Sequence, residues 1–365
     1  MIRLLSLSML LGLASGCGAR ELAAPSPSDE VQVVVAPATH RSVPRPPQLS
    51  RAEPVLWVAL QDHLGSHPAA MPLQLSSAGA PLTLEDGAGR SWTAASFTVR
   101  WRSVALPESV TLARRIAGPF ASFESAERFA QRWRELGVTV SVAHPNDWEV
   151  WAPQGSMVPE GTKVRDWTRR VHATVEPTLE TPEGVQPIKG PLQIAAPAGL
   201  LWNRGVFRGP FRLQPAANGS WTLIEQVAVE RYLEGVVPHE IGAASPVAAL
   251  QAQTVLARTW ALANSHRFNI DGYHLCSDTQ CQVYSDPRSA GAAVRQAITA
   301  TSGRLLSRAG RPISAVYHAT NGGVMAAGPE AWAMKPQPYL VAKVDGDEGW
   351  RERHAIPLQH VQSQR

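Results

Sequence analysis

One stretch of the chain sets a single carboxylate directly before a long apolar segment. Residues 229–241 read VERYLEGVVPHEI, and residues 245–264 read SPVAALQAQTVLARTWALAN. Apolar side chains surround most of the second segment, which predicts a helix in a core rather than on a surface. Ser245 is expected to cap this helix and Pro246 to occupy its first position, where proline loses no hydrogen bond. A fold built around such a helix places Glu240 beside the core.

Glu240 is the candidate general acid. Partial burial raises the proton affinity of a carboxyl group, as a general acid requires; the alternative is a solvated loop carboxylate. Arg258 lies on the apolar helix, and buried arginines are rare unless they are paired. We expect Arg258 to contact Glu240 or a substrate, and the alternative is a structural ion pair with Glu230 or Glu234.

Five short motifs, in order, resemble the stage II sporulation protein D family, which carries the SpoIID/LytB domain. They are YLxGVVPxE at 232–240, ALxAQ at 249–253, ART at 257–259, CQVY at 281–284 and HxxxGG at 318–323. The resemblance extends over roughly residues 187–350, with a weaker match at 55–92.

The resemblance implies a peptidoglycan lytic transglycosylase whose catalytic glutamate is Glu240. Such an enzyme cleaves glycan strands with one carboxyl group and leaves 1,6-anhydro-muramyl ends, whereas hydrolytic glycosidases use two carboxyl groups. The chemistry implies no cofactor. Other members of the family enhance cell-wall amidases, so the second implied function is a non-catalytic, wall-binding partner of an amidase.

Two further segments are expected to contribute substrate-binding residues. Gln282 and Tyr284 follow a cysteine loop that the resemblance places beside the cleft. In the loop at 318–323, Thr320 and Asn321 stand where the family carries serines, and both can hydrogen-bond sugar hydroxyls or an N-acetyl group. The glycine pair allows close approach of the backbone to a ligand; the alternative is a tight turn.

His274, Cys276 and Cys281 place three soft ligands within eight residues, a pattern that suits structural Zn²⁺. Some family members bind zinc through two histidines and two cysteines, but this chain has Gln280 where the family often has a histidine. The rival interpretation is a disulfide between Cys276 and Cys281, which export to an oxidising compartment would favour. Either arrangement would staple the loop.

The beginning of the chain has the form of an export signal. Arg3 precedes the apolar residues 4–13, and small residues then lead to Cys17, as in a bacterial lipobox. Lipid on Cys17 would make an exported, membrane-anchored lipoprotein that faces the cell wall, in the periplasm or on the outer surface. The alternative is ordinary signal cleavage with an incidental cysteine.

Residues 106–155 resemble one half of a SPOR domain, a small module that binds glycan strands stripped of peptides. Apolar residues at helical spacing predict a helix over 123–136. A turn at 145–147 then joins two predicted strands. The alternative is a small α+β packing insert without a binding role.

These patterns predict an α+β fold of mostly antiparallel short strands, with a central buried alanine-rich helix and a small α+β inserted module. The net charge of +4 is mild, and the chain has no basic run dense enough to predict nucleic-acid binding. The expected division is a lipoprotein signal peptide (1–17), a flexible linker (18–54), N-terminal strands of the SpoIID-like domain (55–105), the SPOR-like insert (106–155), a connector with a helix-like patch at 164–171 (156–186) and the catalytic domain (187–355).

Overall fold

The computed structural model describes residues 43–49 and 54–345, which belong to one compact unit of the chain. The predictions for the signal peptide, Cys17, most of the linker and residues 346–355 lie outside these residues. Among the described residues, no helix combines the length and apolarity needed to cross a bilayer.

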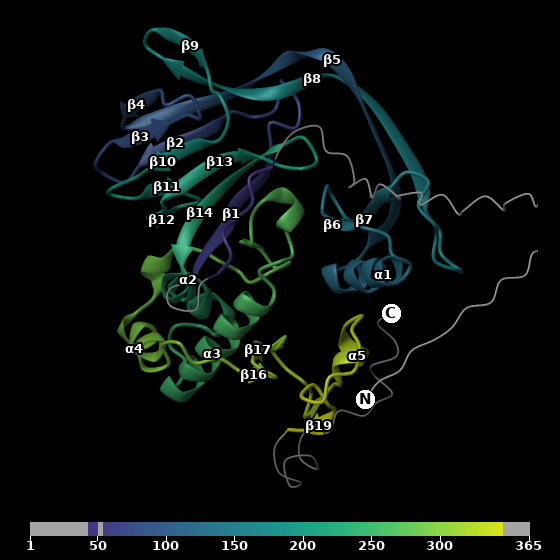
Figure 1. The fold of residues 1–365 in the computed structure, drawn as a ribbon. Coiled ribbons are helices and arrows are strands. Elements are labelled where there is room, and N and C mark those ends of the chain that lie inside the picture. The colour runs from purple at the N-terminus through teal and green to yellow at the C-terminus, as the bar shows by residue number, and fades with distance from the viewer. Residues whose placement is uncertain (1–42, 50–53, 346–365) are drawn as a thin grey trace, which may run out of the picture. The chain divides into compact units, whose positions relative to one another are not determined.

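A seven-stranded sheet joins strands from residues 55–94 with strands from residues 192–276 (Figure 1). Its order is β15 (Leu275–Cys276), β1 (Val55–Leu64), β14 (Trp221–Ala228), β13 (Phe211–Pro215), β10 (Leu192–Ala195), β3 (Leu82–Glu85) and β4 (Ser91–Ala94). β1 pairs with β14 in antiparallel register, and only β15 is parallel to its neighbour. The turn at Asn218-Gly219 joins β13 to β14, and Asn-Gly is a pair that favours tight hairpin turns.

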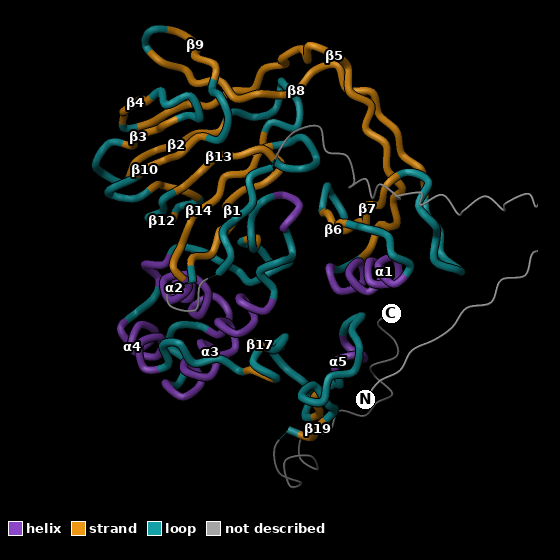
Figure 2. Tube along the Cα trace, in the orientation of Figure 1, coloured by secondary structure: helices purple, strands orange, loops and turns teal. Residues whose placement is uncertain are grey.

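A second sheet of eight strands carries a long two-stranded ribbon. Along its main path the strands are β12 (Gly205–Phe207), β11 (Leu200–Trp202), β2 (Leu73–Ser77), β5 (Ser96–Phe120), β7 (Trp148–Pro153) and β6 (Ser141–Ala143). β5 also pairs over most of its length with β8 (Arg165–Thr181), which pairs in turn with β9 (Gly184–Pro187). The ribbon formed by β5 and β8 is visible in Figure 2.

The far end of this ribbon carries the predicted insert. Helix α1 (Phe123–Glu135) begins at the capping residue Ser122 and packs against β6 and β7. The strand order there is β8–β5–β7–β6, which is the order of a split βαβ motif whose second helix is missing. The helix-like patch predicted at 164–171 is wrong, because residues 165–171 lie in β8, where cross-strand pairing with β5 overrides a weak local pattern.

Three helices follow β14 and lie together in Figure 2: α2 (Val229–Ile241), α3 (Val247–Ala263) and α4 (Ala292–Ala300). The predicted alanine-rich helix is confirmed as α3. The expected caps are wrong, because Pro246 is the N-cap and the Ser245 hydroxyl instead donates to the Ile241 carbonyl.

Smaller elements complete the described chain. They are the 3-10 helices η1 (Asn269–Asp271) and η2 (Pro287–Ser289), the hairpin of β16 (Ser307–Arg308) and β17 (Arg311–Pro312), the pair β18 (Val324–Met325) and β19 (Lys343–Val344), and the short helix α5 (Gly328–Ala331).

The motif before Glu240 is a helix rather than an irregular loop. α2 retains Pro238 in its last turn, where the missing N–H removes one hydrogen bond near an end that would fray anyway. Tyr232, Leu233, Val236 and Val237 of α2 are buried, so burial rather than propensity stabilises the helix.

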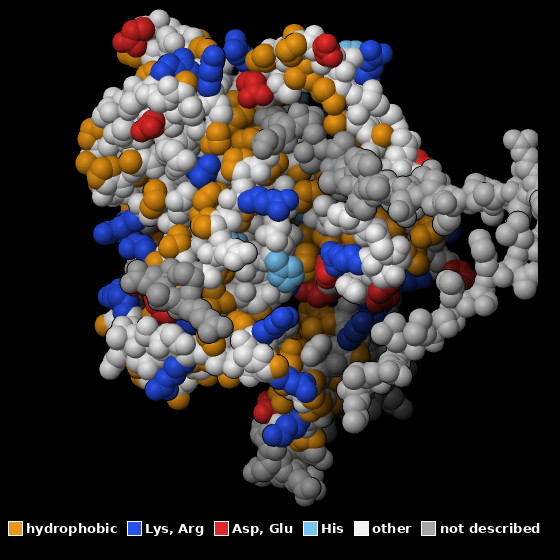
Figure 3. All heavy atoms as spheres, viewed as in Figure 1, with side chains coloured by type: hydrophobic (Ala, Val, Ile, Leu, Met, Phe, Trp, Pro, Cys, Tyr) orange, Lys and Arg blue, Asp and Glu red, His pale blue; other side chains and the backbone are white. Residues whose placement is uncertain are grey.

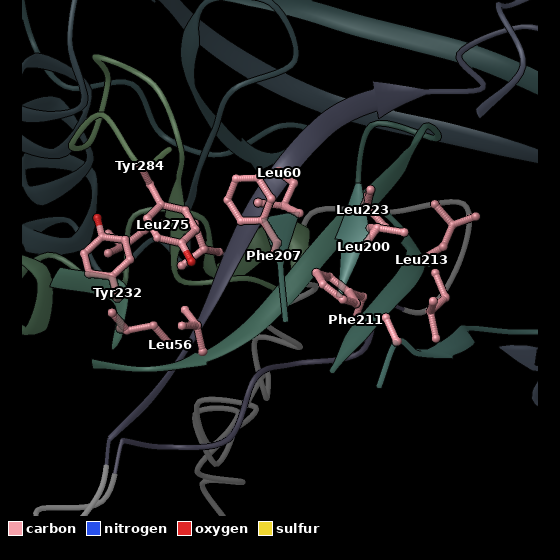
Figure 4. Close-up of a cluster of buried hydrophobic side chains, with 14 of the residues drawn as sticks. Leu56, Leu60, Leu200, Phe207, Phe211, Leu213, Leu223, Tyr232, Leu275 and Tyr284 are labelled. Carbon is pink, nitrogen blue, oxygen red and sulfur yellow. The ribbon is translucent and has the colours of Figure 1, made fainter. Parts of the chain in front are cut away.

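The core lies between the two sheets and continues under the helices. One cluster of buried side chains includes residues of β1, β2, β5, β13, β14, α2, α3 and α4. Figure 4 shows part of it, with Tyr232 and Tyr284 side by side at one end. The α+β fold class expected from the sequence is confirmed: antiparallel strands dominate, and an alanine-rich helix has Leu250, Ala257 and Ala261 fully buried.

Candidate functional site

Glu240 lies in the last turn of α2, and its side chain is half-buried. The backbone N–H of Val283 donates to its Oε1 over 3.1 Å. The hydroxyl of Tyr317 is also hydrogen-bonded to the carboxylate. Two groups from segments far apart in the chain therefore hold Glu240 in one position, while part of the residue remains exposed.

The two contacts to Glu240 belong to a longer chain of hydrogen bonds. The Tyr232 hydroxyl donates to Oε1 of Gln282 over 3.1 Å, and Nε2 of Gln282 donates to the Tyr317 hydroxyl over 3.0 Å. Burial, and then the charge of Glu240, raises the pKa of Tyr317, so its hydroxyl keeps its proton at neutral pH. The donors thus run in one direction, from Tyr232 through Gln282 and Tyr317 to Glu240, and such chains strengthen one another.

Gln282 and Tyr284 lie inside the protein, which corrects their expected role. The side chain of Gln282 is 2% exposed, and that of Tyr284 is 4% exposed. Neither is placed to form a substrate surface, because Gln282 is bonded to two tyrosines and Tyr284 packs against α2. Gln282 is instead a positioning residue for Tyr317.

Tyr284 locks the segment that contacts Glu240. Its hydroxyl donates to Oε2 of Glu225 over 2.8 Å, and the fully buried Glu225 also accepts the N–H groups of Arg208 and Gly209. Burial raises the pKa of Glu225, which the three hydrogen bonds oppose. The ring of Tyr284 lies against Gly235 of α2, and the Ser285 N–H donates to the Gly235 carbonyl.

Arg258 does not point toward Glu240 as expected. Its Nε and Nη2 donate to the two carboxylate oxygens of Glu230 over 2.8 and 2.7 Å, and Nη1 donates to the Arg304 carbonyl. The residue is 1% exposed. The alternative of a structural ion pair with Glu230 is therefore the observed one, because a buried guanidinium requires a nearby partner and Glu230 lies in the first turn of the adjacent helix α2.

The glycine-rich loop at 318–323 follows Tyr317 immediately and so begins beside Glu240. Thr320 is exposed, and its hydroxyl accepts the Gly322 N–H within the loop. Asn321 accepts the Gly323 N–H through Oδ1 and donates to Asp345 through Nδ2 over 2.7 Å. These bonds form a tight turn that leaves Thr320 as the more accessible of the two predicted contacts.

The predicted zinc ligands are engaged with other partners. Cys276 and Cys281 form a disulfide with Cα atoms 5.7 Å apart. The Nδ1 of His274 accepts the Trp57 N–H over 2.9 Å, and the ring also hydrogen-bonds the Pro47 carbonyl. Burial lowers the pKa of His274 to about 4. The three residues therefore do not fit a zinc ion, and the disulfide staples the loop that leads to Val283.

Glu240 does not line either of two cavities in the described part of the chain. The larger, about 1760 Å³, is lined by residues that include Glu230 and Arg258, together with part of α1 and residues 43–49. The smaller, about 340 Å³, lies between β1, β11 and the disulfide loop. Lys and Arg side chains are spread over the face shown in Figure 3 rather than gathered into one patch.

Sequence reasoning missed Tyr317 and Val283. A usable signal existed for Tyr317, because it directly precedes the polar residue that opens the HxxxGG motif. No local signal exists for Val283, since its contribution is a backbone N–H whose direction depends on the packing of the whole loop.

The fold and the site define an α+β domain that presents one fixed, half-exposed carboxylate at the end of a helix. Residues 217–307 match the family model described as Stage II sporulation protein (SpoIID). This match confirms the resemblance found in the sequence over the segment that contains Glu240, Arg258 and the disulfide.

Individual proteins give the same picture. The chain is 36% identical over 121 residues to the amidase enhancer of Bacillus subtilis (strain 168), a match that covers 32% of this chain and 16% of that protein. It is 31% identical over 112 residues to an uncharacterized protein of Brachyspira hyodysenteriae (strain ATCC 49526 / WA1), covering 29% of each. The match thus spans less than a third of the length of either relative.

Proposed function

We propose that the protein acts on the bacterial cell wall and cleaves peptidoglycan glycan strands as a lytic transglycosylase. The observation that carries the proposal is the position of Glu240, which is half-exposed and yet held by the Val283 N–H and the Tyr317 hydroxyl. A carboxyl group that must give and then take a proton at one atom requires such fixed geometry.

The proposed reaction needs one carboxyl group and no water. In the first step, protonated Glu240 gives its proton to the glycosidic oxygen as the bond from that oxygen to C1 breaks. In the second step, the Glu240 carboxylate removes the proton of the C6 hydroxyl, whose oxygen bonds to C1 and closes the 1,6-anhydro ring. Glu240 ends as it began. Proton transfer of this kind contributes typically about 10²–10⁴ in rate.

The neighbours of Glu240 have distinct roles in this scheme. The Val283 N–H and the Tyr317 hydroxyl stabilise the carboxylate that forms when the proton leaves, and they keep its oxygens in place for the second transfer. Gln282 acts through Tyr317 as a positioning residue. Thr320, in the loop that follows Tyr317, is the proposed contact to sugar hydroxyls or to the N-acetyl group.

Product analysis tests the proposal. Purified glycan strands are digested with the wild type, Glu240→Gln, Tyr317→Phe and the control Glu234→Gln, and anhydro-muramyl ends are measured by mass spectrometry. We expect no anhydro ends with Glu240→Gln, about a tenfold loss with Tyr317→Phe, and wild-type yield with Glu234→Gln, which removes another carboxylate of α2. Anhydro ends that persist with Glu240→Gln would refute the assignment.

The second candidate function is enhancement of a cell-wall amidase without catalysis. The identity to the amidase enhancer favours it, as does the loop in which Ala319, Thr320 and Asn321 stand where the family carries serines. This function predicts that wild type and Glu240→Gln release wall fragments equally, and only when an amidase is present. Anhydro ends produced without any amidase would exclude a purely non-catalytic role.

We also propose that the insert of α1, β6, β7 and the adjoining parts of β5 and β8 binds glycan strands stripped of peptides. The support is its strand order together with its contacts to the disulfide loop, where Nε1 of Trp148 donates to Gln280 over 3.1 Å. Deleting residues 121–147 should weaken sedimentation with denuded wall material more than with intact wall.

Export and lipid attachment at Cys17 are proposed from the sequence pattern alone. Cys17→Ser should abolish incorporation of radiolabelled palmitate and release the protein from the membrane fraction, whereas Ser15→Ala should leave both unchanged. Retention of Cys17→Ser in the membrane fraction would refute anchoring through this residue.

A further inference from the structure

We propose that Asp62, His63 and His144 form a binding site for a divalent transition metal ion, and that the ion bound in the cell is Zn²⁺. The three ligands differ from the His274, Cys276 and Cys281 set considered above, and the site goes beyond the proposed glycan cleavage. One carboxylate oxygen and one nitrogen from each imidazole lie within 4.8 Å of one another. Two histidines and one carboxylate are a donor set that zinc binds in proteins, with water in the remaining position.

The backbone of β1 is distorted where two of these ligands arise. The pairing of β1 with β14 shifts register between Ala59 and Gln61 and again between Gln61 and Leu64. Neighbouring residues of a regular strand point to opposite faces, whereas bulges redirect side chains. Here the Oδ2 of Asp62 and the Nε2 of His63 converge to 3.5 Å.

His63 also has a backbone conformation that favours glycine. Its φ angle is 54°, in the left-handed region that non-glycine residues rarely adopt. A histidine in such a position costs free energy that surrounding contacts must offset, and such residues concentrate at functional sites. The fold therefore sustains an unfavourable conformation that directs this imidazole toward Asp62.

The third ligand comes from the insert. His144 lies between β6 and β7, and its ring packs on Trp148 with centroids 4.6 Å apart. His144 is partly buried, and a neutral imidazole nitrogen is the form of histidine that binds metals. Packing against Trp148 limits the movement of the ring, so His144 is held near the other two ligands.

The electrostatic surroundings favour a cation. Asp147 lies in the same turn between β6 and β7 as His144, and Asp278 lies in the disulfide loop. Asp62 and Asp278 both line the smaller cavity, so Asp278 can supply a further oxygen or hold a metal-bound water. The bound ion would connect β1 to the β6–β7 turn and so fix the insert against the strand.

Modest side-chain movement completes the geometry. Tetrahedral zinc with bonds of about 2.0–2.2 Å holds its ligand atoms about 3.3–3.6 Å apart, so atoms that lie within 4.8 Å of one another must move closer by roughly an ångström. Nδ1 of His63 lies 3.1 Å from Nδ2 of Asn218, whose Oδ1 accepts from Ser220. For His63 to bind metal through Nε2, its ring proton must move to Nδ1 and Asn218 must rotate to accept it.

This requirement yields a gain-of-affinity test. Asn218→Asp places a carboxylate where it can accept the Nδ1 proton of His63, as in the carboxylate–histidine–zinc arrangement common in metalloproteins. One oxygen still accepts from Ser220. We expect Asn218→Asp to bind metal about 10-fold or more tightly than the wild type, and the gain to disappear when His63→Asn is added. An equal gain in the His63→Asn background would show a general charge effect and overturn ligation by His63.

The direct experiment uses the full chain without a histidine tag, stripped with a chelator and titrated with Co²⁺ as a spectroscopic substitute for Zn²⁺. We expect visible d–d absorption, competition by Zn²⁺, and a rise in melting temperature on metal addition. Metal binding should weaken at least 10-fold in each of three variants: His63→Asn, Asp62→Asn and His144→Gln. Asparagine is chosen at position 63 because it tolerates a positive φ. His67→Ala, an exposed histidine outside the cluster, is the matched control.

Circular dichroism and the chelator-treated melting temperature establish that each variant folds. If the folded ligand variants bind Co²⁺ as tightly as wild type, or if the wild type shows neither absorption nor stabilisation, the site does not exist. The yield of anhydro products, with and without the chelator, measures the proposed glycan cleavage independently of metal binding. Failure of one proposal can therefore be distinguished from failure of the other.

Discussion

Gly235→Ala should destabilise the protein although alanine is the better helix former. Gly235 lies within α2, and an added Cβ would come within 2.4 Å of the Tyr284 ring and 2.6 Å of the Ser285 carbonyl oxygen. Ordinary carbon contacts are about 3.5–4.0 Å, so these neighbours would have to move by about an ångström.

The neighbours of Gly235 have little freedom to move. The Tyr284 hydroxyl is bonded to the buried Glu225, and its ring lies 5.0 Å from that of Tyr232 and 5.6 Å from that of Phe207. Over-packing a core costs typically about 1–3 kcal/mol. Loss of the Tyr284 hydrogen bond would destabilise the protein by about 1–3 kcal/mol more. The higher helix propensity of alanine would offset about 1 kcal/mol of this loss.

We therefore expect Gly235→Ala to lower the free energy of unfolding by about 3 kcal/mol. The change is measured by urea unfolding followed by tryptophan fluorescence and far-UV circular dichroism. Gly291→Ala is the matched control: its Cβ meets nothing within 4 Å and its φ is −67°, so a change below about 1 kcal/mol is expected.

Gly235→Ala should also reduce activity per folded molecule, because residues 283–285 move together and carry the Val283 N–H away from Glu240. A variant within about 0.5 kcal/mol of the wild type, the usual range for neutral surface changes, would refute the packing of Tyr284 on α2. A destabilised variant with full activity would refute the link from this packing to Glu240.

Three further predictions follow from other contacts. Arg258→Met should lower the free energy of unfolding by about 2–4 kcal/mol, somewhat less than for a fully buried pair because Glu230 is 35% exposed; lost activity without lost stability in urea titrations would restore a substrate role. Burial raises the pKa of Asp271 to about 7, so the folded state holds a proton that the unfolded state releases near 3.8. Stability should therefore fall as pH rises between these values, by at most about 1.4 kcal/mol per unit, and urea titrations across this range should show that Asp271→Asn removes the slope; an unchanged slope would contradict the shift. Reducing the Cys276–Cys281 disulfide should cost about 2 kcal/mol by loop-closure entropy, checked by comparing the unfolding of the oxidised protein with that of a Cys276→Ser, Cys281→Ser variant; equal stability would contradict it.

Local sequence patterns were sufficient to predict a helix where that helix buries one apolar face. The helical spacing of Phe129 and Trp133 predicted α1, and the apolar residues after Pro246 predicted α3. Both predictions were possible because a helix that buries one face has apolar residues at regular intervals along the sequence. Such features require no knowledge of the rest of the fold.

Local patterns failed where the outcome depends on competition among distant partners. Residues 165–171 form part of β8 because they pair with β5. The α2 segment is helical in spite of Pro238 because its apolar side chains are buried. The sequence could not decide which carboxylate pairs with Arg258, since Glu230 and Glu240 lie on the same preceding segment. Only the packing of α2 against α3 brings one of them within reach.

The sequence by itself identified the SpoIID motifs, the α+β class and Glu240 as the candidate acid, since motif spacing and hydrophobic periodicity are properties of nearby residues. The tertiary structure alone decided that Tyr317 and Val283 hold Glu240, and that His144 comes close to Asp62 and His63. Those contacts join segments whose separation along the chain carries no local signal. Their proximity arises only when sheet pairing and core burial bring the segments together.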